Sequence, residues 1–264
     1  MKIGIDLHVV DGMFQGSRTH VIELFSRVAE LCPEYEFYGL LDNVESFKKE
    51  YPAFNLPNFN LVHMPHSSSI KRLVWQLPKL QRKLNLDILH TQYIVPLPSL
   101  SQTMVTIHDV LFESHPEYFT AMSRIRSRIF MRLAAYQASH VFTVSNYSKQ
   151  ELCQRYGLTS DDVSVIYNGA DFNRFYPGKD GVAYLKKRGL ISGQYFITVG
   201  RLEPRKNHVT LLRAYSKLGK DAPQLVIVGQ KDFGFESLFE EITDPKIRER
   251  VLVIEDVGDH ELPA

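Results

Sequence analysis

The sequence has few features that would place the protein outside the cell or in a membrane. It has only two cysteines, Cys32 and Cys153, which lie far apart in 264 residues, so we do not expect a disulfide scaffold. No apolar run approaches the roughly 18 residues that span a bilayer. Asp6 and His8 interrupt the N-terminal segment before a signal-peptide core could form. These absences predict a soluble protein of the reducing cytoplasm.

The sequence also lacks the charge excess and the motifs of several other protein classes. Its net charge is +1, which gives no reason to expect a nucleic-acid partner. The ten histidines have no metal-ligand spacing, and His63 and His66 stand on either side of Pro65 in an expected loop. No D-x-D sequence follows an apolar strand, so we expect neither a metal nor any other cofactor.

What is present is an alternation of strand and helix patterns. Apolar runs with β-branched residues predict strands at 2–9, 36–42, 59–65, 87–91, 103–108, 140–145 and 162–167. Helical periodicity predicts helices at 19–31, 70–84, 121–138 and 147–156. This order is typical of a doubly wound, Rossmann-like α/β domain with a largely parallel sheet.

A second alternation follows Asn168-Gly169. The irregular segment 170–180, with Pro177-Gly178, is typical of a linker. Beyond it we expect helices at 182–189, 207–218 and 236–249, and strands at 195–200, 224–229 and 250–255. Three strands are few for an independent domain of this kind. We therefore expect a first domain over 1–175 and an incomplete second domain over 176–264.

The turn after strand 195–200 is the most informative motif. The strand ends at Gly200, and Arg201, Arg205 and Lys206 follow before the next helix begins. Free N–H groups and the positive end of the helix dipole lie at such a turn, so with these cations it suits a diphosphate. A solvated basic turn is the alternative interpretation.

The second motif is the pair His108-Asp109 at the end of strand 103–108. Open α/β sheets bind their ligands at the carboxyl ends of their strands. There His108 could donate a hydrogen bond or act as acid or base, with Asp109 orienting it or fixing the loop. The alternative is structural: His108 ends the strand and Asp109 opens the next turn.

The third motif is the first strand-to-helix turn. Gly12 and Gly16 predict a flexible loop, and Ser17 or Thr19 could cap the helix that follows. The turn does not match G-x-G-x-x-G, which disfavours a dinucleotide cofactor. Arg18 at the start of the helix either faces a ligand or lies in solvent.

These motifs, in this order, resemble the retaining glycosyltransferases of family 4, which have two facing Rossmann domains, the GT-B fold. Asn168-Gly-Ala-Asp171 and Val144-Ser-Asn-Tyr-Ser-Lys149 are similar to segments of that family. Val199-Gly-Arg-Leu-Glu-Pro-Arg-Lys-Asn-His208 resembles its donor-phosphate turn, and Gln224-Leu-Val-Ile-Val-Gly229 resembles the next strand. The resemblance covers essentially the whole chain.

The resemblance implies roles for particular residues. Arg201 and Lys206 would bind the diphosphate of a nucleotide sugar, and His108 would lie beside the transferred sugar. The Gly12–Gly16 loop, with Ser17 and Arg18, would lie over the cleft, and Asn168-Gly169 would form the linker or hinge. A glycan or a lipid-linked sugar would be the acceptor.

One part of the family pattern is missing. Family members carry two glutamates eight positions apart that contact the donor sugar and ribose. Glu241 and Glu249 have that spacing, but Pro245 lies between them and they precede strand 250–255. We therefore expect the functional pair to lie beyond Ala264, and we expect the 264-residue chain to be inactive by itself.

Two segments mix cations with apolar residues: 70–84 around Trp75, and 121–138, which carries four arginines. Such helices either rest on anionic lipid at the inner face of the membrane or have an ordinary charged solvent face.

Three hypotheses for function follow. The first is sugar transfer from a nucleotide donor. The second is another enzyme on the same scaffold, a sugar-nucleotide epimerase or a phosphorylase. The third is a non-catalytic fragment that binds an acceptor or a partner.

Overall fold

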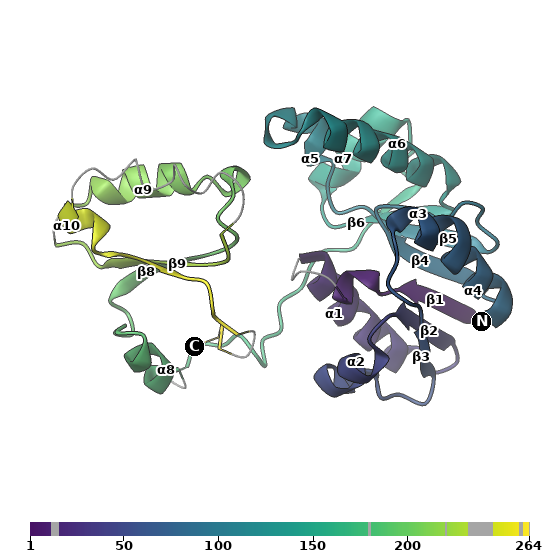
Figure 1. Ribbon diagram of the computed structural model, residues 1–264, viewed down its shortest axis with the longest axis horizontal. Helices are drawn as coiled ribbons and strands as arrows, with labels where there is room; N and C mark the ends of the chain where they lie inside the picture. The colour runs from purple at the N-terminus through teal and green to yellow at the C-terminus, as the bar shows by residue number, and fades with distance from the viewer. Residues whose placement is uncertain (12–15, 179–180, 220, 232–244, 259–260, 264) are drawn as a thin grey trace. The chain divides into compact units, whose positions relative to one another are not determined.

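The computed structural model describes residues 1–11, 16–178, 181–219, 221–231, 245–258 and 261–263 (Figure 1). The chain divides into two compact units, Met1–Asn168 and Gly169–Ala264. Each unit is an α/β structure built on its own parallel sheet.

The first unit contains a seven-stranded parallel sheet in the order β3-β2-β1-β4-β5-β6-β7. Its strands are β1 (Lys2–Asp6), β2 (Glu36–Leu41), β3 (Phe59–His63), β4 (Ile88–Gln92), β5 (Gln102–Thr106), β6 (His140–Thr143) and β7 (Val163–Val165). The chain proceeds outward from β1 to β3, then returns to place β4 on the other side of β1. The topology therefore reverses between β1 and β4, and ligands of doubly wound sheets bind at that point.

Helices cover both faces of this sheet (Figure 1). They are α1 (Gly16–Leu31), α2 (Val44–Glu50), α3 (Ser69–Lys71), α4 (Leu77–Leu84), α5 (Leu111–Ser114), α6 (Ala121–Gln137) and α7 (Asn146–Tyr156), and a π-helical segment, Arg72–Gln76, joins α3 to α4. The helices α1 and α2 pack on β1–β3 around Phe25 and Phe37, while α5, α6 and α7 pack on the later strands around Met131 and Leu152. The strand β4 is buried along its whole length, as expected for a central strand of a parallel sheet.

The second unit contains a three-stranded parallel sheet in the order β10-β9-β8. Its elements are α8 (Val182–Lys187), β8 (Tyr195–Val199), α9 (His208–Ser216), β9 (Gln224–Val228), α10 (Pro245–Arg248) and β10 (Val251–Ile254). Leu212 and Ile227 belong to a cluster on one face, and Leu185 and Val226 to a cluster on the other. The edge strand β8 leaves Phe196, Ile197 and Val199 47%, 55% and 55% exposed.

The structure confirms the expected doubly wound α/β architecture and corrects several bounds. The strand expected at 2–9 ends at Asp6, because a 3₁₀ turn begins at His8. The helices α2 and α5 were not expected. Of the helix expected at 236–249, residues 236–244 lie outside the described residues, and α10 occupies 245–248.

Candidate functional site

The polar residues of the first unit gather at the carboxyl edge of its sheet. Gln92 ends β4, and His108 follows two residues after the end of β5. These strands are neighbours, and β4 also pairs with β1 at the point where the topology reverses. The fold therefore brings His108 to the edge where its sequence position placed it.

The imidazole of His108 is held by three side chains. Its Nε2 lies 2.9 Å from Oε1 of Gln92. The ring of His20 meets it edge-on, with 4.8 Å between ring centroids, and Tyr93 lies at 5.4 Å. Burial, together with the neighbouring His20, lowers the pKa of His108 to about 4. His108 is therefore neutral at pH 7 and available as a hydrogen-bonding group.

A layer of histidines continues behind His108. His20 on α1 is buried, and its Nδ1 lies 3.0 Å from Oδ1 of Asn168, the last residue of the first unit. Burial lowers the pKa of His20, although the hydrogen bond to Asn168 opposes this shift. His90 on β4 is also buried, with Nε2 2.8 Å from Oγ1 of Thr106, and burial lowers its pKa to about 3. The imidazoles of His20, His90 and His108 are therefore neutral at pH 7.

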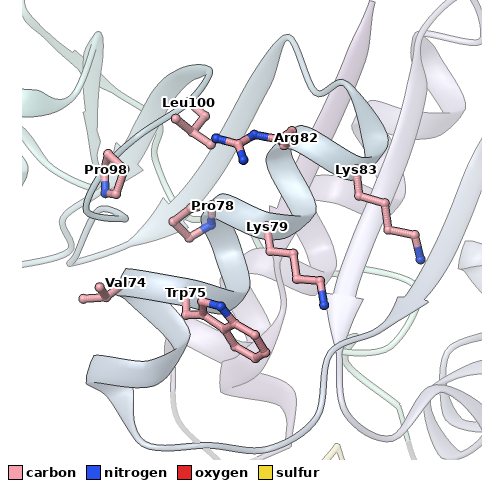
Figure 2. Close-up of a pocket in the computed structure, with 8 residues that line it drawn as sticks. All are labelled: Val74, Trp75, Pro78, Lys79, Arg82, Lys83, Pro98 and Leu100. Atoms are coloured by element: carbon pink, nitrogen blue, oxygen red, sulfur yellow. The ribbon is translucent and has the colours of Figure 1, made fainter.

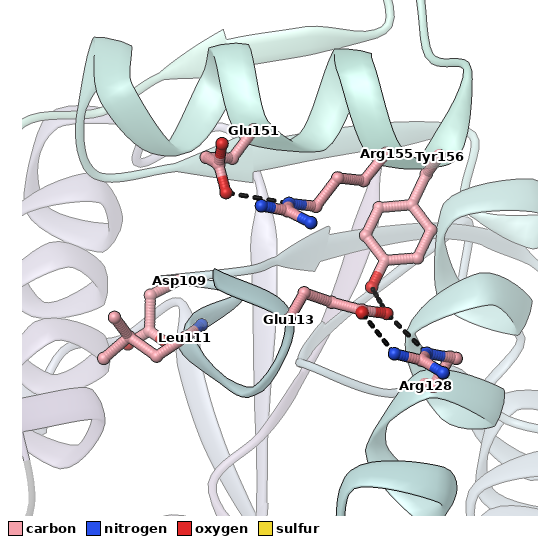
Figure 3. A network of polar contacts seen from close by, with 7 residues as sticks. All are labelled: Asp109, Leu111, Glu113, Arg128, Glu151, Arg155 and Tyr156. Carbon is pink, nitrogen blue, oxygen red and sulfur yellow. Dashed lines mark hydrogen bonds and ion pairs between the residues drawn. The ribbon is translucent and has the colours of Figure 1, made fainter. Parts of the chain in front are cut away.

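Asp109 acts on the loop rather than on the imidazole. Its Oδ1 accepts a hydrogen bond from the backbone N–H of Leu111, 3.2 Å away, at the start of α5 (Figure 3). The expected orienting contact with His108 is instead made by Gln92. Of the two roles considered for Asp109, the structure favours fixing the loop.

An ion pair secures the short helix α5 behind Asp109. Glu113 accepts two hydrogen bonds from Arg128 of α6, at 2.8 and 2.6 Å, and a third from the hydroxyl of Tyr156 (Figure 3). The hydrogen bonds from Arg128 lower the pKa of Glu113. Arg128 is thus engaged in an ion pair within the protein.

The first strand-to-helix segment is described in part. Gly12 lies outside the described residues, whereas Gly16 begins α1. Ser17 and Thr19 therefore lie within the first turns of α1, and the expectation that either caps the helix is wrong. The carbonyl oxygen of Ser17 accepts a hydrogen bond from Nε2 of Gln92 at 3.2 Å.

Arg18 is held against α2. Its guanidinium lies 2.7 Å from both Oε1 of Glu50 and the hydroxyl of Tyr51, and its side chain is only 12% exposed. The alternative that Arg18 lies in solvent is therefore wrong. Together with Asp11 and Asp42, Arg18 and Glu50 line an open hollow of about 470 Å³.

A buried charge cluster lies at the end of β1. The carboxylate of Asp6 is 3.1 Å from Nδ1 of His8 and 3.6 Å from Nε of Arg72. Burial raises the pKa of Asp6, but His8 and Arg72 outweigh this effect and hold the pKa at about 2. The charged carboxylate therefore ties the end of β1 to the π-helical segment.

The basic turn of the second unit begins at the carboxyl end of β8. It stays attached to the neighbouring strand, because Gly200 N donates to Val228 O and Leu202 N donates to Gln230 O, both at 2.9 Å. In the sequence, Arg201 lies between Gly200 and Leu202, the two residues that donate these hydrogen bonds. A 3₁₀ turn over Pro204–Lys206 then leads to α9.

The cations of this turn differ in their surroundings. Arg205 forms an ion pair with Glu203 at 2.6 Å. Lys206 is exposed, and its side-chain carbons Cδ and Cε pass close to Gly200. The charge of Lys206, after burial, contributes to lowering the pKa of His208 at the start of α9. Lys206 is therefore placed at the positive end of the α9 dipole, where an anion would bind.

The structure gives two further observations of the described residues. They contain no group of three or more His, Cys, Asp or Glu side chains that could hold a metal ion. None of the helices formed by them is long and apolar enough to cross a bilayer.

Sequence reasoning missed Gln92, His20 and Tyr93. Gln92 is the last residue of the buried strand β4 and Tyr93 follows it, and polar residues at the carboxyl end of a buried strand beside β1 are a signal for a site. His20 lies inside a helix pattern and gives no such signal.

Two family models match this chain. The model of the family "Glycosyltransferase Family 4" matches residues 14–174, and that of "Glycosyl transferases group 1" matches residues 186–264.

Two curated relatives are mannosyltransferases. The chain is 25% identical over 224 residues to the O-antigen chain mannosyltransferase RfbU of Salmonella typhimurium, covering 81% of this chain and 58% of the relative. It is 29% identical over 160 residues to the GDP-mannose-dependent alpha-(1-6)-phosphatidylinositol monomannoside mannosyltransferase of Mycolicibacterium smegmatis, covering 60% of this chain and 39% of that enzyme. The chain thus spans less than two thirds of the length of either relative.

A solved structure shows the same fold. Anabaena Alr3699/HepE, in complex with UDP and glucose, matches with a TM-score of 0.70 at 20% identity, covering 99% of this chain and 71% of that one. This likeness shows the GT-B fold, built on Rossmann-like units. Because the family 4 model matches more than half of its residues, the chain belongs to glycosyltransferase family 4.

Proposed function

We propose that the whole protein transfers a hexose from a nucleotide-diphosphate sugar to a glycan or lipid-linked acceptor, with retention of configuration and without a metal. The observation that carries this proposal is the turn after β8. It brings the backbone of Gly200, the cation Lys206 and the start of α9 to one sheet edge. These are the groups that bind a diphosphate.

The chemistry requires charge stabilisation at two places. When the bond between the anomeric carbon and the phosphate oxygen breaks, both electrons stay with the nucleoside diphosphate, and the sugar gains oxocarbenium character. Arg201 and Lys206 would stabilise the departing negative charge. The acceptor hydroxyl would then form the new bond on the same face and give its proton to the leaving phosphate oxygen.

The contacts of two carboxylates at this sheet edge, Asp109 and Asp6, support this mechanism over a covalent one. A covalent route would need a free carboxylate nucleophile beside the sugar. Oδ1 of Asp109 accepts a hydrogen bond from the N–H of Leu111, and Asp6 is buried between His8 and Arg72.

His108 would contact the transferred sugar as a neutral hydrogen-bonding group. Its pKa of about 4 makes it a poor proton acceptor at neutral pH. We assign it to binding the sugar in the transition state rather than to moving a proton.

We also propose peripheral contact with anionic lipid. A shallow groove of about 400 Å³ is lined by Val74, Trp75, Pro78, Lys79, Arg82, Lys83, Pro98 and Leu100 (Figure 2). Trp75 is 57% exposed, with the ammonium groups of Lys79 and Lys71 5.0 and 5.9 Å from its ring centroid. An aromatic ring between cations suits the headgroup region of an anionic bilayer.

Trp75 is the only tryptophan, so its fluorescence reports this contact directly. Vesicles containing phosphatidylglycerol should shift its emission to shorter wavelength, and vesicles of phosphatidylcholine alone should not. Lys79→Glu should abolish the shift, whereas Lys217→Glu in the second unit should leave it unchanged. Equal shifts with both vesicle types would contradict a role for charge.

The transfer proposal is tested with a chain of the relatives' full length. GDP-mannose and UDP-glucose are the first donors to test. One relative is named as a GDP-mannose-dependent enzyme, and one structural neighbour was solved in complex with UDP and glucose. His108→Ala should lower turnover at least tenfold while leaving binding of the free nucleoside diphosphate within threefold. Unchanged turnover in His108→Ala would mean that His108 has a structural role. A reaction that only inverts the configuration at C2 of the nucleotide sugar would indicate an epimerase.

A further inference from the structure

The side chain of Gln92 connects the first turn of α1 to His108. Its Nε2 lies 3.2 Å from the carbonyl oxygen of Ser17, and its Oε1 lies 2.9 Å from Nε2 of His108. Gln92 is only 2% exposed, so water does not compete for these contacts.

This chain of contacts fixes which atom carries each proton. A backbone carbonyl can only accept a hydrogen bond, so the end of Gln92 that faces Ser17 is the NH₂ group. The other end is then the carbonyl oxygen, which also can only accept. Nε2 of His108 therefore carries a proton and donates a hydrogen bond to Oε1 of Gln92.

The protonation state of Nδ1 of His108 follows from that of Nε2. Burial keeps the ring neutral at pH 7, and a neutral imidazole has one N–H and one lone pair. With the proton on Nε2, the lone pair is on Nδ1. The ring cannot easily turn over, because His20 and Tyr93 pack on it at 4.8 and 5.4 Å.

We infer that Gln92 is a positioning residue that sets the tautomer of His108, so that Nδ1 accepts a hydrogen bond from a hydroxyl of the transferred sugar. This inference rests on the proposed function for the identity of the ligand, but the tautomer itself does not. Because Ser17 belongs to the first turn of α1, the backbone there also determines the orientation of Gln92.

The charged and titratable groups near His108 do not set its tautomer in another way. His20 from α1 faces the ring edge-on and is itself held by Asn168. Asp109 directs its Oδ1 to the N–H of Leu111, and the ring of Tyr93 lies tilted by 40° to that of His108. Among the described side chains, Gln92 makes the hydrogen bond to the imidazole that the structure shows.

The test is NMR of the 264-residue protein with ¹⁵N-labelled histidine, in which the His108 signals are assigned by their loss in His108→Ala. At pH 7 the parent protein should show one tautomer of His108, with Nε2 protonated. Gln92→Leu should give a mixture of both tautomers. Gln81→Leu is the matched control, because Gln81 is an equally buried glutamine of the same unit with hydrogen bonds elsewhere, and it should leave the tautomer unchanged.

A second variant covers the case in which Gln92→Leu fails to fold. Gln92→Glu keeps the shape and still accepts from His108, but it places a negative charge beside the ring. It should raise the pKa of His108 by at least one unit. An unchanged tautomer in Gln92→Leu, or an unchanged pKa in Gln92→Glu, would overturn the inference.

Activity in the full-length protein separates this inference from the proposed function. Gln92→Leu should lower kcat at least tenfold and leave KM for the nucleotide sugar within threefold. If the tautomer changes but neither Gln92→Leu nor His108→Ala affects transfer, the contact with the sugar is refuted, whereas Gln92 still positions the ring.

Discussion

In the second unit, the carbonyl group of Gly200 lies against Gly229 at the point where any other residue would carry its Cβ atom. Gly200 follows β8 and Gly229 follows β9, so the two loops at this sheet edge meet backbone to backbone. This contact holds the basic turn in place, since no side chain separates the loops.

Gly229→Ala should therefore disturb the turn. The new methyl group would contact backbone atoms, which cannot move aside as a flexible side chain can, and we expect a cost of about 1–3 kcal/mol in the stability of the second unit. Chemical denaturation measures this cost. Gly169→Ala is the control, because nothing lies within 4 Å of the added methyl group there. Equal stability of the two variants would show that the loops separate freely.

Lys206→Ala should weaken binding of a nucleoside diphosphate by roughly 1.5–3 kcal/mol, as expected for loss of a charge-assisted contact. Isothermal titration calorimetry on a chain of the relatives' full length measures this effect. Lys217→Ala removes another exposed lysine, at the opposite end of α9, and should leave affinity unchanged. Equal affinity of the Lys206→Ala variant and the parent would support a merely solvated turn.

The sequence predicted the strands well for a physical reason. The strands of a parallel sheet are covered on both faces, so they form continuous apolar runs that stand out, as at β9. The helix α2 was missed because its seven residues are mostly polar and bury only Phe47. Short helices of that kind take their stability from tertiary contacts that local patterns do not show.

The site was predictable in part. His108 comes two residues after β5 and Lys206 lies in the turn that follows β8, so their place at a sheet edge could be predicted from order alone. The partner of His108 could not, because Gln92 is 16 residues away and becomes a neighbour only when β4 pairs with β5. Arg18 likewise reaches Glu50 and Tyr51 only through the packing of α1 near α2.

The first unit should lose stability as the pH falls from 7 to 5. The pKa of buried His90 is about 3 in the folded state, against an ordinary value of 6.5. Below pH 6.5 the unfolded chain therefore binds a proton that the folded chain does not, so stability falls with pH until about pH 3. For His90 this amounts to about 2 kcal/mol between pH 7 and pH 5.

Urea denaturation of the parent protein and of His90→Gln at both pH values measures this contribution. The variant cannot titrate at this position, so its loss of stability on acidification should be smaller by about 2 kcal/mol. Parallel losses in the two proteins would mean that His90 is protonated without cost.

The two units should differ in local stability. The first unit has seven strands with β4 buried throughout, whereas the second has three described strands, with apolar side chains of β8 about half exposed. Less buried apolar surface means a lower free energy of opening. We expect the free energy of opening for the amides of β8 to be lower than that for the amides of β4 by about 2 kcal/mol or more.

Hydrogen exchange of the 264-residue chain, read by mass spectrometry, gives both values. The strand β9, paired on both sides, is the internal control and should be the slowest of the second sheet. Equal protection of β4 and β8 would show that the small sheet is as stable as the large one.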